Sequence, residues 1–66
     1  MFVYFNNTST ETTAGNLDGF IREQGWYDKK GIAVALNQSV IPKSEWEQTP
    51  IKENDNILVI TATQGG

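Results

Sequence analysis

The feature that most constrains this chain is that its 66 residues must fold without a single cysteine. A domain of this size buries only about 60% of its unfolded surface, and many such domains rely on disulfides, a metal or oligomerisation. The lack of cysteine excludes disulfides and thiolate metal sites, and the lack of histidine excludes a histidine base or a histidine zinc site. We therefore expect one small domain held by a hydrophobic core, with no catalytic residue, metal or cofactor.

The charge of the chain limits its partners. A formal net charge of −3 argues against nucleic acid as the main partner, because phosphate binding needs a basic surface, but it suits a partner with a basic patch. The apolar run over residues 1–5 is too short for a signal peptide or a membrane span. We therefore expect a cytoplasmic location, or an organelle matrix if a transit peptide was removed, and no membrane partner.

The first half of the sequence predicts a hairpin followed by a helix. Residues 1–5 are aromatic and β-branched and predict a strand, Asn6-Asn7 predicts a turn, and the threonine-rich residues 8–13 predict the return strand at an edge. Asn16 is a good N-cap for a short helix that ends at Gly25. Three apolar residues at helical spacing mark the buried face of this helix: Leu17, Phe20 and Ile21.

The second half predicts three strands and a helical turn. Residues 32–36 alternate large and small side chains, as a strand with one packed and one smooth side does. Residues 39–41 predict a short strand that Pro42 ends, and residues 43–46 one helical turn that places Trp46 over the core. Residues 50–56 are predicted to form a connecting loop, in which Asn54 is a candidate for positive φ. The last strand is predicted over residues 57–62.

This order of elements predicts an α+β fold with a mixed sheet and one main helix packed on one face. The first and last strands carry the largest apolar side chains, so we place them side by side at the centre. Alternation then directs Met1, Val3, Phe5, Ile57 and Val59 to the helix. The opposite face receives four large apolar side chains, which predict an interaction surface for partners: Phe2, Tyr4, Leu58 and Ile60.

The sequence ends in two glycines, which give no stability to the strand before them because glycine loses the most backbone entropy on ordering. We predict a domain over residues 1–62 and a flexible tail over residues 63–66, made of Thr63, Gln64, Gly65 and Gly66. A chain end without Cβ atoms can pass through a narrow slot and deliver its α-carboxylate. That carboxylate is unreactive until a partner activates it, since the chain has no phosphate-binding loop or nucleophilic cysteine.

From Gly31 to Gly66 the sequence resembles the ThiS family of sulfur carriers of the thiamine pathway. The resemblance rests on the AVALN strand, the segment from Ile41 to Trp46 with its Pro and Lys, the Asn54-Asp55-x-Ile57 entry to the last strand, and the Gly-Gly end. It implies a ubiquitin-like β-grasp fold. It also implies that an E1-like (ThiF-like) enzyme adenylates the Gly66 carboxylate, that a sulfur donor enzyme helps convert it to a thiocarboxylate, and that thiazole synthase (ThiG-like) receives the sulfur. By the same resemblance, the face with Leu58 and Ile60 docks on these partners.

Three alternatives stay open at this stage. A MoaD-like sulfur carrier for molybdopterin synthesis shares the fold and the Gly-Gly end, although the segment from Pro42 to Trp46 fits it poorly. A ubiquitin-like modifier would be joined to lysines through Gly66. A plain interaction domain would use neither reaction. In every case we expect the free chain to be a monomer.

Overall fold

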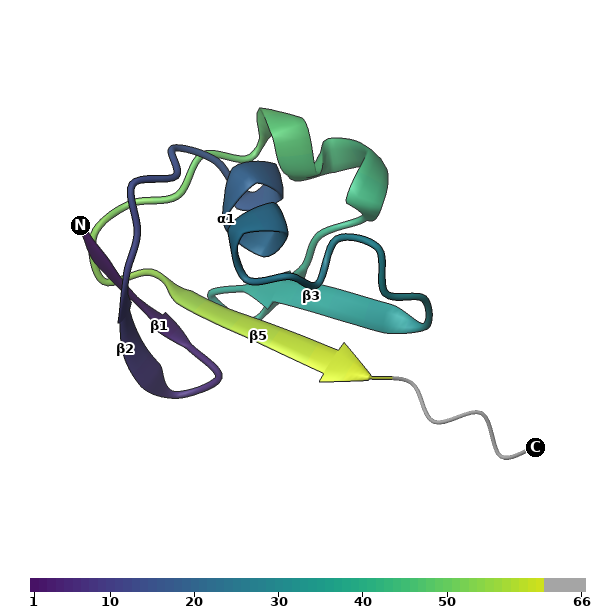
Figure 1. Cartoon of the computed structure of the whole chain (residues 1–66), viewed down its shortest axis with the longest axis horizontal. Helices are drawn as coiled ribbons and strands as arrows, with labels where there is room; N and C mark the ends of the chain where they lie inside the picture. Colours follow the sequence, from purple (N-terminus) through teal and green to yellow (C-terminus); the bar gives the residue numbers. More distant parts are fainter. Residues whose placement is uncertain (62–66) are drawn as a thin grey trace.

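The strands form a single mixed sheet, most of which is labelled in Figure 1. The computed structural model describes residues 1–61, so the end of the predicted last strand at Ala62 and the predicted tail over residues 63–66 lie outside the described residues. The elements are β1 (Phe2–Phe5), β2 (Thr8–Glu11), α1 (Leu17–Glu23), β3 (Ile32–Leu36), β4 (Ser39–Val40), the 3-10 helix η1 (Lys43–Gln48) and β5 (Asn56–Thr61). Among the described residues the sheet has five strands, in the order β2-β1-β5-β3-β4.

The topology confirms the predicted α+β fold. β5 is the central strand, and it pairs parallel with β1 and antiparallel with β3. The two hairpins, β1–β2 and β3–β4, flank it and are antiparallel. In Figure 1, α1 and η1 lie on the same side of the sheet. A mixed sheet with parallel first and last strands at its middle and one main helix on one face is the β-grasp, ubiquitin-like arrangement.

The core lies between this sheet and α1. The helix buries Leu17, Phe20 and Ile21 completely, as their spacing predicted. From the sheet come Val3, Val34 and Ile57, which are also fully buried or nearly so. The remaining predicted helix-facing residues, Met1, Phe5 and Val59, pack against this cluster, and the Phe5 ring meets that of Phe20 edge-on with 5.3 Å between centroids.

Both ends of α1 are capped as the sequence predicted. The Asn16 side chain accepts a hydrogen bond of 2.7 Å from the Gly19 N–H, and Gly25 follows the C-cap with φ at 82°. A Cβ on Gly19 would lie only 3.1 Å from that Asn16 oxygen. Glycine within the helix therefore costs propensity but makes room for the cap, a reason that helix propensity alone does not reveal.

The segment from Pro42 to Ile51 covers the rest of the core. η1 is longer than the one helical turn predicted over residues 43–46, and it buries Trp46 to 2% exposure. Residues 50–56 were predicted as plain connecting loop, but Ile51 is buried, and its N–H donates to the Gly15 carbonyl. The prediction missed this because an isolated isoleucine in a polar stretch has no periodicity to mark it.

The return strand of the first hairpin is shorter than predicted. β2 ends at Glu11, whereas the sequence suggested residues 8–13. Thr12 still bonds to the first strand, because its N–H donates to the Met1 carbonyl at 2.8 Å and its carbonyl accepts from the Met1 terminal ammonium at 3.0 Å. Thr12 is buried, and its hydroxyl donates to the Glu23 carboxylate at 2.6 Å while accepting from the Ala14 N–H. Backbone bonding between the two strands thus extends to Thr12, and the Thr12 hydroxyl links this end of the hairpin to α1.

Asn54 has φ at 71°, which confirms the positive φ predicted for it. No hydrogen bond from its side chain occurs within residues 1–61, so the backbone conformation is its main contribution. We expect Asn54→Ala to lower the free energy of unfolding by about 1 kcal/mol, because a residue with a larger penalty for left-handed backbone replaces a tolerant one. Asn54→Gly is the matched control and should not lower it. Urea unfolding followed by circular dichroism measures both, and equal stability of the alanine variant would contradict the assigned conformation.

Candidate interaction face and the end of β5

The four residues predicted to face partners share one side of the sheet. We call this side, opposite α1, the open face. Phe2 and Tyr4 of β1 are 48% and 44% exposed, and Ile60 of β5 is 53% exposed. Leu58 lies on the same face and is half-buried. Their burial alternates with that of Val3 and Ile57, so the strand register agrees with the prediction.

Cross-strand pairing extends the β5 part of the open face onto β3. Ile60 pairs with Ala33 and Leu58 pairs with Ala35 on the neighbouring strand. The two alanines form the smooth side predicted for residues 32–36, on which Ala33 is half-buried and Ala35 is buried. Large apolar side chains thus project from β1 and β5 beside a flat floor on β3, a shape suited to docking another protein.

Val40 extends the open face and was not among the residues predicted to face partners. It pairs with Ala35 across the β3–β4 hairpin and is 65% exposed. The signal was present in the sequence: Asn37-Gln38 forms a two-residue turn with positive φ at both positions, which fixes the register of the hairpin. Counting from that turn places Val40 on the same side as Ala35.

β5 is paired with β3 as far as Thr61 and is held on its other side only as far as Val59. Five residue pairs join it to β3, from Leu36↔Ile57 to Ile32↔Thr61. On its other side, β1 pairs only with Asn56 and Ile57. Beyond Ile57, the Asn6 side chain accepts a hydrogen bond of 2.9 Å from the Val59 N–H. The last described residue, Thr61, therefore still belongs to a paired strand.

The predicted site residues Thr63, Gln64, Gly65 and Gly66 lie outside the described residues. Within residues 1–61 no group of three or more acidic side chains is placed to hold a metal ion. None of the helices in the same range is long and apolar enough to cross a membrane.

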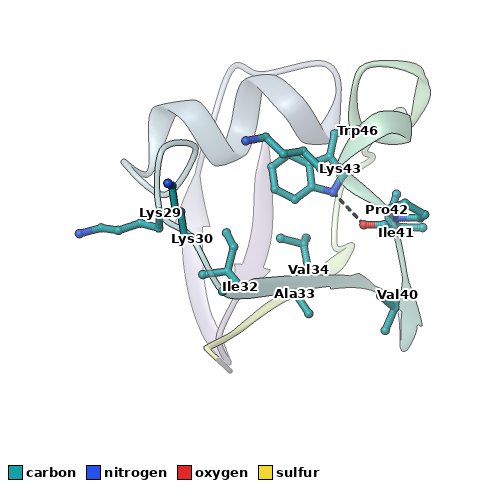
Figure 2. A pocket seen from close by; sticks show the side chains of 11 residues that line it. Lys29, Lys30, Ile32, Ala33, Val34, Val40, Ile41, Pro42, Lys43 and Trp46 are labelled. Atoms are coloured by element: carbon teal, nitrogen blue, oxygen red, sulfur yellow. Dashed lines mark hydrogen bonds between the residues drawn. The ribbon is translucent and has the colours of Figure 1, made fainter. Parts of the chain in front are cut away.

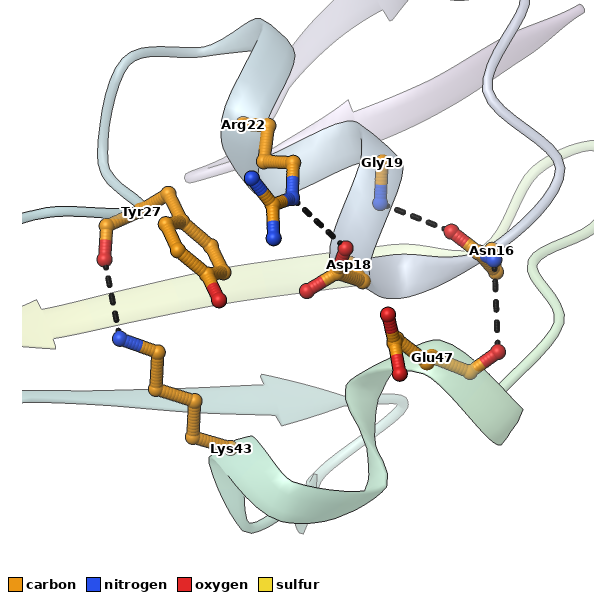
Figure 3. Close-up of polar contacts among 7 residues, drawn as sticks. All are labelled: Asn16, Asp18, Gly19, Arg22, Tyr27, Lys43 and Glu47. Carbon is orange, nitrogen blue, oxygen red and sulfur yellow. Dashed lines mark hydrogen bonds and ion pairs between the residues drawn. The ribbon is translucent and has the colours of Figure 1, made fainter.

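A cationic cluster lies on the helix side of the sheet, around Tyr27, and is shown in Figure 3. The Arg22 guanidinium lies 3.6 Å from the centre of the Tyr27 ring, and the Lys43 ammonium lies 4.2 Å from it. Lys43 also donates to the Tyr27 carbonyl at 3.2 Å. The hydrogen bond of 2.8 Å from Arg22 to Asp18 raises the pKa of the guanidinium. These contacts tie the 26–31 loop to α1 and η1.

Comparison with known proteins places this architecture in a family. Residues 3–66 match the ThiS family. The sulfur carrier protein ThiS of Escherichia coli is 30% identical over 66 residues, covering all of both chains.

Two solved structures share the fold. The crystal structure of the thiamine biosynthesis protein ThiS from Geobacter metallireducens matches with a TM-score of 0.85 at 17% identity, over the full length of both chains. The solution structure of a thiamine biosynthesis protein from the same organism matches with a TM-score of 0.76 at 17% identity, covering all of this chain and 88% of the other.

Proposed function

This chain belongs to the ThiS family of small sulfur carrier proteins, which are not enzymes, and we propose that it carries sulfur as a thiocarboxylate formed at Gly66. The sulfur is donated to the thiazole ring of thiamine. The chemistry runs in the cytoplasm, with residues 1–62 as the folded domain and 63–66 as the reactive tail.

The observation that carries this proposal is the position of β5. It is the central strand, it is paired up to Thr61, and its outward side carries half-buried Leu58 and exposed Ile60. The sequence then runs through residues 62–66 to Gly65-Gly66. A rigid strand beside a docking face, followed by a terminus without side chains, suits a protein whose reactive carbon is delivered into the active site of another protein.

The proposed chemistry occurs entirely at the carboxylate. An oxygen of the Gly66 carboxylate attacks the α-phosphorus of ATP on an E1-like adenylating enzyme, and pyrophosphate leaves. A sulfur nucleophile at the oxidation level of sulfide, supplied by a sulfur donor enzyme, then attacks the acyl carbon and displaces AMP. The chain has no cysteine, so sulfur has no thiol on which to travel, and the carboxylate is the remaining carrier group.

We propose that the open face docks first on the adenylating enzyme and then on thiazole synthase. Phe2, Tyr4, Leu58 and Ile60 form its centre, and Val40 extends it. Large apolar side chains that remain exposed in the free protein gain the most from burial in a partner.

Ile60→Arg tests this face. We expect it to weaken binding to the adenylating enzyme by about 30-fold, because it removes a central apolar contact and places a charge in the interface. Its free energy of unfolding should change by less than about 1 kcal/mol, because Ile60 is more than half exposed. Thr13→Arg is the matched control, since Thr13 is exposed outside the open face and the charge change is the same. Isothermal titration calorimetry measures the affinity of each variant for the adenylating enzyme. Equal affinities of the two variants would contradict the assignment of the open face.

The thiamine pathway is tested against molybdopterin synthesis and protein tagging by supplying thiocarboxylated protein to each acceptor. We expect thiazole synthase to consume the thiocarboxylate and the large subunit of molybdopterin synthase to leave it intact. The reverse preference would assign the chain to molybdopterin synthesis. Isopeptide adducts on lysines would assign it to the ubiquitin-like modifiers.

A further inference from the structure

A groove at the β3 edge of the sheet takes no part in the proposed sulfur chemistry. It has a volume of about 400 Å³, within the range of about 300–1,000 Å³ usual for ligand sites. Figure 2 shows its floor, where Ile32 and Val34 of β3 lie beneath the Trp46 indole, with Ile41 and Pro42 at the far end. Lys29 and Lys30 stand at the other end, and Lys43 lies beside Trp46.

The groove exists because the short strand β4 covers only part of β3. Pro42 turns the chain away after β4, and only Ala35 and Leu36 are paired with that strand. The Ile41 N–H still donates to the Val34 carbonyl, but the Ile41 carbonyl accepts instead from the Trp46 indole at 2.8 Å. Val34 is itself fully buried. Ile32, the first residue of β3, lies beyond the part of the strand that β4 covers. Ile32 is half-buried, and its backbone lies at an uncovered strand edge.

The register shows which way the Ile32 backbone points. Val34 and Leu36 direct their polar groups toward β4, so Ala33 and Ala35 direct theirs toward β5. Ile32 follows the pattern of Val34 and presents its N–H and C=O on the uncovered side. Within residues 1–61 no hydrogen bond occupies these two groups. An uncovered strand edge is a site at which a peptide adds as a further strand.

The rim of the groove is cationic in a chain that is acidic overall. Three of the five basic residues line it, and none of the acidic residues does. The one ion pair within the described residues, Arg22 with Asp18, lies elsewhere. Lys43 is engaged by Tyr27, whereas Lys29 and Lys30 are exposed and have no carboxylate partner in the same range.

We propose that this groove binds an extended, acidic peptide segment of a partner protein. One residue of the segment pairs with the backbone of Ile32, a large apolar side chain packs on the floor beside Trp46, and carboxylates meet Lys29 and Lys30. Charge selects this occupant, because the cationic rim attracts acidic chains. A second copy of this protein fits less well: its acidic edge strand, β2 (TSTE), has one acidic residue, Glu11, and no large apolar side chain to pack beside Trp46.

The test uses a capped hexapeptide that alternates valine and glutamate, titrated into the full chain and followed by amide chemical shifts. We expect saturable shifts at Gly31, Ile32 and Ala33, with binding that weakens as salt is raised. A matched peptide with lysine in place of glutamate tests charge, and one N-methylated on alternate residues tests backbone pairing. Both should bind at least about fivefold more weakly.

Two charge variants sharpen this test. Lys30→Glu should weaken binding of the acidic peptide by about fivefold, while Lys52→Glu, which makes the same charge change away from the groove, should change it by about twofold or less. Equal effects of the two variants, shifts centred on Phe2, Tyr4 and Ile60 rather than on the groove, or equal binding of the lysine peptide would overturn the proposal. Groove shifts that grow with protein concentration alone would also overturn it, by identifying a second copy as the occupant. Thiocarboxylate formation is measured separately, so failure here leaves the sulfur chemistry untouched.

Discussion

Adding one alanine after Gly66 should abolish thiocarboxylate formation while leaving the fold as stable as before. The addition converts the Gly66 carboxylate into a peptide carbonyl. A peptide carbonyl has no carboxylate oxygen to attack ATP, so the adenylating enzyme cannot adenylate it. It also places the new carboxylate one residue further along, on a residue with a Cβ. Misplacement of a reacting group by even about 1 Å costs on the order of 100-fold in rate, so we expect product below detection. Intact-mass spectrometry after incubation with the adenylating enzyme, ATP and a sulfur donor measures it.

The control for this variant is its stability. All buried core residues of the described chain lie between Val3 and Ile57, so the added alanine should change the free energy of unfolding by less than about 0.5 kcal/mol. A larger loss would show that the terminus packs on the domain, contrary to the proposal. Thiocarboxylate formation on the extended chain would show that Gly66 is not the reactive residue.

Trp46→Ala should have the largest effect on stability. Trp46 is 2% exposed, its indole N–H donates to the Ile41 carbonyl, and its ring meets the Tyr27 ring with 6.3 Å between centroids. Truncating such a residue costs about 3–5 kcal/mol. Domains have a total stability of about 5–15 kcal/mol, so a large part of it would be lost. Urea unfolding followed by circular dichroism measures the change.

Trp46→Phe separates the hydrogen bond from the packing. Phenylalanine keeps most of the apolar volume but leaves the Ile41 carbonyl without its donor, which should cost about 1–3 kcal/mol. The phenylalanine variant should therefore fall between the parent and the alanine variant. An alanine variant as stable as the parent would mean that η1 does not close the core.

Periodicity predicted most of this fold. Alternation along β1 and β5 placed Val3 and Ile57 inside and Phe2 and Ile60 outside, and both assignments are confirmed. The spacing of Leu17 and Phe20, with the Asn16 cap, predicted α1 almost to its boundaries. These features were predictable because neighbours in the sequence determine them.

Contacts between distant residues were not predictable in this way. The Asn6 side chain binds the Val59 backbone, and the buried Ile51 pairs with the chain near Gly15. The groove beside Ile32 depends on where β4 ends and on the hydrogen bond that the Trp46 indole donates to the Ile41 carbonyl. These contacts depend on the assembled tertiary structure, because only there do polar groups that are distant in the sequence come close enough to bond. The chemistry proposed for Gly66 was reached from the sequence and the family resemblance, since residues 62–66 lie outside the described residues.

The most direct test of the central claim is the intact mass of the protein purified from its native cells during thiamine starvation. The proposal predicts a species in which one oxygen is replaced by one sulfur, with fragmentation placing the change at Gly66. Under thiamine-replete conditions this species should decline. Persistent absence of any thiocarboxylate during starvation, in protein whose C-terminal Gly65-Gly66 is intact, would contradict the proposal that this chain is a sulfur carrier for thiazole formation.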